Sequence, residues 1–159
     1  MDVREAGADD VPGIVEAYLR SWRAAYADAL DPHALDEQAE RRRHRHDWAG
    51  VVADPDATVV VGVDDDGRIR GVVHAEAATV VMLYVDPDAW GTGLAAQLLA
   101  AGERGIAGRG HAVARLRVVE DHHRARRFYE REGWTLDPDH PPERTELATL
   151  VPYWKPLGG

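Results

Sequence analysis

The first part of the chain has the hydrophobic spacing of helices. An acidic, proline-containing start at residues 9–12 precedes apolar residues at helical intervals, namely Ile14, Val15, Tyr18, Leu19, Trp22 and Tyr26. This spacing puts them on one face of a predicted helix. A second start at Asp31-Pro32 predicts another helix over Leu35–Trp48, and Val3–Glu5 ahead of both is expected to be a short strand.

From residue 58 onward the pattern changes to that of strands. A valine-rich run over 58–63 is followed by the turn sequence Asp-Asp-Asp-Gly, and the chain returns over 68–76 and again over 79–85. Runs of this kind bounded by turn residues predict antiparallel strands. Downstream, the pattern predicts helices over about 92–107 and 122–132, and strands over 112–119, 134–136 and 144–154.

The order of elements, βααβββαβαββ, predicts the class of fold. The strand–helix–strand unit over 79–119 implies a parallel pair of strands with a right-handed crossover, whereas the hairpin before it implies antiparallel pairing. We therefore expect an α/β fold with a mixed sheet of six to seven strands and helices on both faces. No repeat or linker divides the sequence, so residues 1–159 are expected to form a single domain.

Composition narrows the function classes. The chain has 19 Lys and Arg against 28 Asp and Glu, a net charge of −9, which argues against a nucleic-acid partner. It has no cysteine, which excludes a zinc–thiolate site and a cysteine nucleophile. His44 and His46 are two positions apart and would diverge on a helix, so no metal site is expected. Without a leader pattern or a long apolar run, a cytoplasmic location with no membrane partner is expected.

The stretch Ala-Trp-Gly-Thr-Gly-Leu-Ala-Ala-Gln-Leu-Leu at 89–99 places two glycines directly before a helical pattern. A helix N-terminus presents unpaired amides, and glycine lets an anion approach the backbone closely. The stretch lacks the Lys-Ser/Thr pair of a P-loop and the third glycine of a dinucleotide fingerprint. When the two glycines are considered alone, a plain strand-to-helix turn explains them better.

A second segment, Leu-Arg-Val-Val-Glu-Asp-His-His-Arg-Ala-Arg-Arg-Phe-Tyr-Glu-Arg-Glu-Gly-Trp at 116–134, gives the loop a context. Together the two segments resemble the motifs of the GNAT acetyltransferase superfamily, and the resemblance covers nearly the whole chain. Gly93 and Ala95 match the central motif; the later motif is matched by Ala125, Phe128, Tyr129, Glu130 and Gly133. Two positions depart from the pattern: Trp90 replaces an Arg or Gln, and His122 replaces an Asn.

The resemblance implies acetyl-CoA as the co-substrate. Its pyrophosphate would lie on the backbone amides of the glycine loop, at Trp90, Gly91, Thr92, Gly93, Leu94, Ala95 and Ala96. Because Trp90 supplies no side-chain cation, these amides are expected to carry the binding. The pantetheine arm would lie beside residues 82–85, at Leu83 and Val85, with His122 and Ala125 on the other side.

The implied reaction is an N-acetyl transfer by direct attack of a primary amine on the thioester. By resemblance, the Leu83 amide is expected to bind the oxyanion and Tyr129 to protonate the CoA thiolate. Thr79 occupies a position where some members have a glutamate, so the base is sought elsewhere. Glu76, acting directly or through water, and His74, on the same strand face, are the alternatives, and either could instead be an ordinary strand residue.

The acceptor is expected to be a small molecule or a peptide with a primary amine. Trp22 and Tyr26 lie in the region that selects acceptors in this family and, with carboxylates nearby, would suit a cationic amine; they fit a buried helix face equally well. Arg41–Arg43 are expected to form a solvated helix face. A non-catalytic acyl-CoA-binding module of the same fold is the alternative function, and a homodimer is allowed because the residues do not decide the oligomeric state.

Overall fold

The computed structural model describes residues 1–28 and 30–158. Two 3-10 turns, Ala8–Asp10 and Pro87–Ala89, accompany the helices α1 (Val11–Tyr26), α2 (Pro32–Arg42), α3 (Trp48–Ala53), α4 (Leu94–Gly108) and α5 (His123–Arg131). The strands are β1 (Asp2–Glu5), β2 (Ala57–Val63), β3 (Ile69–Glu76), β4 (Thr79–Val85), β5 (Val113–Val119), β6 (Thr135–Leu136), β7 (Glu143–Arg144) and β8 (Thr149–Pro156). The order of elements follows the sequence pattern closely, and β4 has the expected bounds.

The strands form one mixed sheet in the order β1-β2-β3-β4-β5-β8-β6, with β7 also paired to β8. The β4–β5 pair is parallel and the other pairs are antiparallel, which confirms the mixed α/β fold expected from the crossover. The described residues form eight strands, one more than the seven strand segments of the sequence pattern. The tail divides because Thr145 Oγ1 donates a hydrogen bond to the Ala148 carbonyl across a tight turn.

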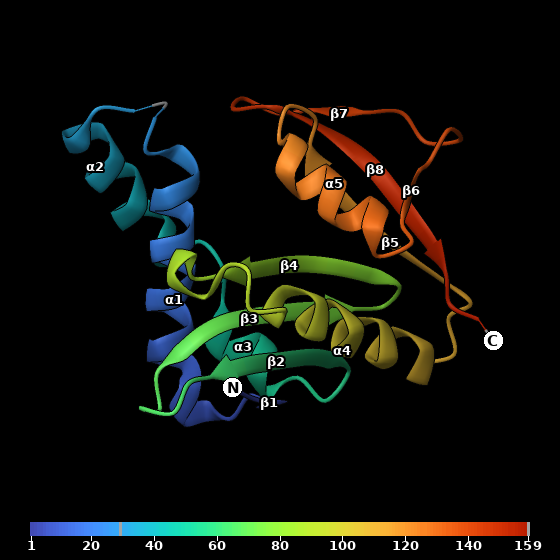
Figure 1. The fold of residues 1–159 in the computed structure, drawn as a ribbon, viewed down its shortest axis with the longest axis horizontal. Helices are drawn as coiled ribbons and strands as arrows, with labels where there is room; N and C mark the ends of the chain where they lie inside the picture. Colours follow the sequence, from blue (N-terminus) through green and yellow to red (C-terminus); the bar gives the residue numbers. More distant parts are fainter. Residues whose placement is uncertain (29, 159) are drawn as a thin grey trace.

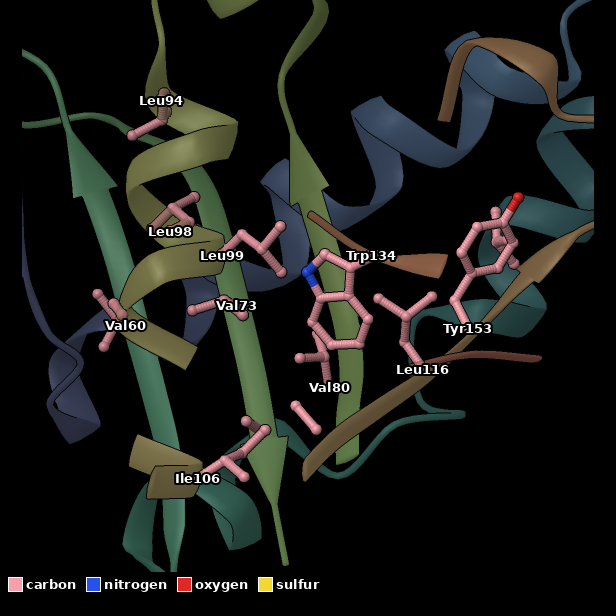
Figure 2. Packing of buried hydrophobic residues seen from close by; sticks show 14 of the residues in the cluster. Val60, Val73, Val80, Leu94, Leu98, Leu99, Ile106, Leu116, Trp134 and Tyr153 are labelled. Atoms are coloured by element: carbon pink, nitrogen blue, oxygen red, sulfur yellow. The ribbon is translucent and has the colours of Figure 1, made fainter. Parts of the chain in front are cut away.

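Helices cover both faces of the sheet (Figure 1). Successive strand residues point to opposite faces. On β2 and β3, Val60 and Val73 accordingly pack with α4, whereas Val61 and Val72 pack with α1 and α3. Figure 2 shows Leu98 of α4 directed onto the strands beside Val73. The core therefore has two layers, one on each side of the sheet.

The helix expected over Leu35–Trp48 is instead two helices, α2 and α3. The chain turns after α2, where the Arg45 amide donates to the Arg42 carbonyl over 3.1 Å. Asp47 then starts α3, because its carboxylate accepts a hydrogen bond from the Gly50 amide over 3.0 Å. This break allows the segment between the two helices to reach the sheet. No helix in the part of the chain that the structure describes is both long and apolar enough to span a bilayer.

Candidate active site

The central strands separate at the middle of the sheet. The parallel strands β4 and β5 pair only at Thr79 and Arg115, at the start of β4. Beyond this point the two strands diverge, and β5 stays with β8 while β4 stays with β3 (Figure 1). The second half of β4 therefore has a strand partner on one edge only. We call the region between the diverging strands the splay.

The free edge of β4 exposes defined backbone groups toward the splay. The Asp86 amide donates to the Arg70 carbonyl of β3 over 2.7 Å, which fixes the hydrogen-bonded positions of this antiparallel pair. Since these positions alternate along the strand, Leu83 and Val85 direct their N–H and C=O groups away from β3. The Val85 carbonyl accepts a hydrogen bond from the Trp90 indole over 3.0 Å. The Leu83 amide has no strand partner among the described residues.

The glycine loop ends directly on the helix that follows β4. Gly91 and Gly93 have φ angles of 80° and 85°, a conformation that other residues adopt with strain. A Cβ at either position would point into open space. The first helical hydrogen bond of α4 runs from the Gln97 amide to Gly93, so the amides of Ala95 and Ala96 have no partner within the helix. The loop thus combines open space beside two glycines with free backbone amides at the start of α4.

Asp86 holds the start of this loop. It is 2% exposed, and its carboxylate lies 2.6 Å from Arg20 of α1 and 3.2 Å from Arg70 of β3. Burial acts to raise the pKa of Asp86, but hydrogen bonds from the Asp88 amide and from Arg20 outweigh it, so the pKa is lowered. A charged carboxylate therefore ties the loop to one helix and one strand.

Trp90 does not leave the loop without a cation. The guanidinium of Arg124, at the start of α5, lies over the Trp90 ring at 3.8 Å from its centroid. The loop itself has no Lys or Arg, as expected from its sequence, and the positive charge beside it comes from α5, on the other side of the splay. Trp90 itself is 46% exposed. Its indole donates to the Val85 carbonyl on one side of the splay, and Arg124 lies over its ring from the other side.

His122 is the N-cap of α5, and its cap hydrogen bond involves Ala125, which was also expected to contact the cofactor. Its Nδ1 accepts a hydrogen bond from the Ala125 amide over 3.3 Å. The Ala125 amide is consequently occupied inside the helix cap. This bond places the proton of a neutral His122 ring on Nε2, which leaves that atom as a donor.

Tyr129 lies on α5, across the splay from β4. Its ring packs edge-on against Phe128 and Trp134, and burial raises its pKa to about 12. Burial also raises the pKa of Tyr84 on β4, and the hydroxyls of Tyr18, Tyr26 and Tyr129 add to this rise. Tyr129 and Leu83 of β4 pack against the same core cluster, and the Tyr129 hydroxyl has no hydrogen-bond partner among the described residues.

The aromatic residues expected at the acceptor side form part of a small core. Trp22 is 5% exposed and stacks on Tyr26, with ring centroids 4.9 Å apart. Tyr18 of α1 meets Tyr84 of β4 edge-on at 4.8 Å. The side chain of Trp22 is thus largely covered, whereas Tyr26 is half-buried.

Arg42 contradicts the expected solvated face of Arg41–Arg43. Its side chain is 8% exposed and lies 4.8 Å from the centroid of the Trp22 ring. Arg41 is exposed, and Arg43 pairs with Glu16 at 2.6 Å. Arg42 follows Leu35 and Ala39 at helical spacing, so it lies on the buried stripe of α2 despite its charge.

The two expected base candidates belong to a chain of three side chains. His74 is 1% exposed, and its Nδ1 lies 3.1 Å from Nε2 of His46 in the segment between α2 and α3. On its other side, Nε2 of His74 lies 2.8 Å from the Glu76 carboxylate, although the ring N–H is not aligned for a straight hydrogen bond. Burial lowers the pKa of both histidines. His74 therefore lies buried between His46 and Glu76.

Comparison with known proteins agrees with this geometry. The model of the acetyltransferase (GNAT) family matches residues 13–134. The chain belongs to this family. The family and fold expected from the two sequence motifs are thereby confirmed.

Two relatives are mycothiol acetyltransferases. The one from Stackebrandtia nassauensis is 34% identical over 139 residues, covering 80% of this chain and 44% of its own length. The one from Clavibacter sepedonicus is 38% identical over 128 residues, covering 73% and 42%. This GNAT chain spans less than half the length of these relatives.

Solved structures share the fold at low sequence identity. The PaiA N-acetyltransferase from Thermoplasma acidophilum, solved in complex with coenzyme A, has a TM-score of 0.79 at 16% identity and covers 98% of both chains. Aminoglycoside 6′-acetyltransferase type Ii has a TM-score of 0.67 at 17% identity and covers 100% of this chain and 99% of its own. These likenesses concern the GNAT fold alone.

Three side chains of the site region were not identified from the sequence. Arg124 and His46 carry no local signal, because each depends on a contact with a distant segment. For Arg42 the signal was present: the spacing from Leu35 and Ala39 predicts a buried position. The helical phase of Arg42, and not the charge of the arginine run, determines its burial.

Proposed function

We propose that this GNAT chain transfers an acetyl group from acetyl-CoA to a primary amine. The observation that carries the proposal is the unpaired Leu83 amide at the free edge of β4, in a splay that has the glycine loop at its mouth and Tyr129 packed against the same core cluster as Leu83. Family membership supports acetyl-CoA as the co-substrate. A backbone donor, an acid and an anion site on one path are what acyl transfer from a CoA thioester requires.

The residues of the loop fit the phosphates of CoA. The amides of Ala95 and Ala96 lie at the N-terminus of a long helix, where the helix dipole adds partial positive charge. The open space beside Gly91 and Gly93 admits an oxyanion without a Cβ contact. Arg124 adds a full positive charge at the same mouth. Backbone and side chain together would hold the pyrophosphate.

Acetyl-CoA, when bound, supplies an activated acetyl thioester beside β4. The Leu83 amide donates a hydrogen bond to the carbonyl oxygen, where negative charge grows as the amine attacks. Tyr129 donates a hydrogen bond to the departing sulfur, where negative charge develops as the bond breaks. With a pKa of about 12, the Tyr129 phenol is protonated at neutral pH and available as a donor.

The chain His46–His74–Glu76 is the proposed route for the proton that the amine loses. A carboxylate only accepts hydrogen bonds, so Glu76 favours the tautomer with the proton on Nε2 of His74. His74 Nδ1 then accepts from His46 Nε2, which leaves Nδ1 of His46 as the free basic atom. His46 would accept the proton, directly or through water, while His74 and Glu76 position it.

The test measures two properties of the same preparation. Acetyl-CoA binding is followed by calorimetry, and CoA release is followed with a thiol reagent against amino acids, aminoglycosides, polyamines, peptides and the acceptor of the mycothiol acetyltransferases. Binding together with amine-dependent CoA release is expected. Binding without release for every amine would favour the non-catalytic acyl-CoA-binding module, and absence of binding would refute both functions.

A further inference from the structure

Arg42 is a buried cation without an anionic partner. Its side chain is 8% exposed, and its Nε is buried without a hydrogen-bond partner. No carboxylate of the described residues lies within ion-pair distance of it, whereas Arg20, Arg43 and Arg70 each have at least one. Removing a charge from water costs several kcal/mol unless an opposite charge compensates it. The ring of Trp22, 4.8 Å away, compensates only part of this cost.

The guanidinium of Arg42 lies among groups that border β4. Burial raises the pKa of both Tyr18 and Tyr84, and the positive charge of Arg42 counteracts the rise at each hydroxyl. Trp22, over which Arg42 lies, packs in one cluster with Tyr18 and Tyr84, and the rings of these two tyrosines meet with centroids 4.8 Å apart. Tyr84 is the immediate neighbour of Leu83, and its pKa also responds to Tyr129. The cation thus lies on the α1–α2 side of the stretch of β4 where the amine would react.

We propose that Arg42 binds an oxyanion of the acceptor, so that the acceptor is a primary amine that also carries a carboxylate or a phosphate group. The inference rests on the proposed acetyl transfer. A guanidinium presents a planar fork of N–H donors that matches both kinds of oxyanion with two hydrogen bonds. An amino acid or a phosphorylated amine would supply the missing charge, whereas a polyamine would add positive charge beside it.

Matched amines test the proposal by kcat/KM. The probes are phenylalanine against phenylalaninamide, which differ in the carboxylate, and phosphoethanolamine against ethanolamine, which differ in the phosphate. We expect the wild-type chain to prefer the anionic member of at least one pair. Loss of a hydrogen-bonded charge contact is worth about 1.5–3 kcal/mol, so Arg42→Met is expected to reduce that preference about 10- to 100-fold.

The variants are chosen to separate charge, shape and folding. Arg42→Lys keeps the charge and the long stem but loses the fork, and it serves if Arg42→Met does not fold. Arg41→Met, an exposed neighbour on the same helix, makes the same change of charge and is the matched control, with the preference unchanged. The preferred pair identifies the oxyanion as carboxylate or phosphate.

A binding measurement keeps the proposal falsifiable without turnover. The Arg42 Nε–H signal in a ¹⁵N NMR spectrum, assigned by its loss in Arg42→Met, is expected to shift with one anionic probe and not with its neutral match. No shift and no preference would overturn the proposal, as would an equal loss on both members of a pair. A weakened acetyl-CoA affinity of Arg42→Met with an unchanged preference would also overturn it. Wild-type protein that binds no acetyl-CoA would instead refute the acetyl transfer itself.

Discussion

The phenol of Tyr129 can be removed with little disturbance to the fold. Tyr129→Phe deletes one oxygen that bonds no described residue, and the ring contacts with Phe128 and Trp134 remain. The free energy of unfolding is therefore expected to change by less than about 0.5 kcal/mol, as for substitutions that break no specific contact. Any large loss of activity would then report on chemistry.

The size of that loss follows from the acidity of the phenol. With a pKa of about 12, Tyr129 is a weaker acid than a thiol at about 8.5, so complete proton transfer ahead of bond cleavage is uphill. Its benefit is a hydrogen bond to a developing thiolate, which is worth about 1.5–3 kcal/mol. We therefore expect Tyr129→Phe to lower kcat about 10- to 100-fold, with acetyl-CoA affinity nearly unchanged.

The assay is CoA release at saturating acetyl-CoA, with affinity measured separately by calorimetry. Tyr153→Phe is the matched control, because its hydroxyl accepts a hydrogen bond from Arg126 Nε over 2.9 Å and has a structural explanation. It is expected to lose about 1 kcal/mol of stability and no turnover. If folded Tyr129→Phe keeps kcat within about threefold of wild type, the hydrogen bond to the thiolate is refuted.

Three further variants test the mouth of the splay and its anchor. Gly93→Val is expected to abolish CoA binding measured by calorimetry. The control is Gly67→Val: Gly67 has a similar positive φ in a hairpin turn, so valine there introduces a similar backbone strain of about 1–2 kcal/mol, but CoA binding should be retained. Arg124→Met is expected to weaken CoA binding about tenfold and to reduce its salt dependence, with exposed Arg127→Met as the control. Asp86→Asn leaves Arg20 without its carboxylate, while Arg70 keeps Asp64, and is expected to lower the free energy of unfolding by about 3–5 kcal/mol in urea titrations at pH 7. Because folding lowers the pKa of Asp86, its contribution to stability is fully present above pH 3.8, the pKa of the unfolded chain. The contribution is lost as the pH falls through the pKa of Asp86 in the folded protein.

The sheet was predictable because its signals are local. The alternation of β-branched residues and the Asp-rich turn identify the strands around residues 57–85, and the glycine pair marks the start of α4. The break between α2 and α3 depends on the Asp47 cap, which the apolar spacing on either side obscured. A single polar cap between two apolar segments is a weaker sequence signal than the periodicity on either side of it, so the boundary between α2 and α3 is hard to predict.

The site was predictable only where the backbone itself forms it. The positive φ angles at Gly91 and Gly93 follow from the residue type, so the loop could be located from the sequence. The contact of Arg124 with Trp90 could not, because 34 positions of sequence separate the two residues and only the diverging strands bring them together. The helical spacing of Trp22 allows a buried face, and the packing of α2 across α1 covers it. Long-range packing, which no local spacing encodes, decides these positions.

The histidine pair makes the reaction sensitive to pH in a direction that the structure fixes. Burial lowers the pKa of His46 and of His74; Glu76 opposes this at both rings. Asp47 also acts to raise the pKa of His46. At His74, Asp54 acts to raise the pKa and Arg109 acts to lower it. Both rings are therefore neutral at pH 7, and protonation below an ordinary value of about 6.5 removes the base. We expect kcat/KM to rise with pH and to level off below pH 6.5.

Substitutions along the chain separate the base from its positioning residues. His46→Gln is expected to remove the acidic limb of the pH profile and to lower the plateau about 100-fold or more, with His44→Gln, an exposed neighbour, as the control. Glu76→Gln removes a charge that favours the protonated rings, so the limb should move to lower pH while the tautomer is less well fixed. A structural Glu76 would change stability without moving the limb. An unmoved limb in His46→Gln, or a plateau equal to that of wild type, would show that the proton leaves by another route.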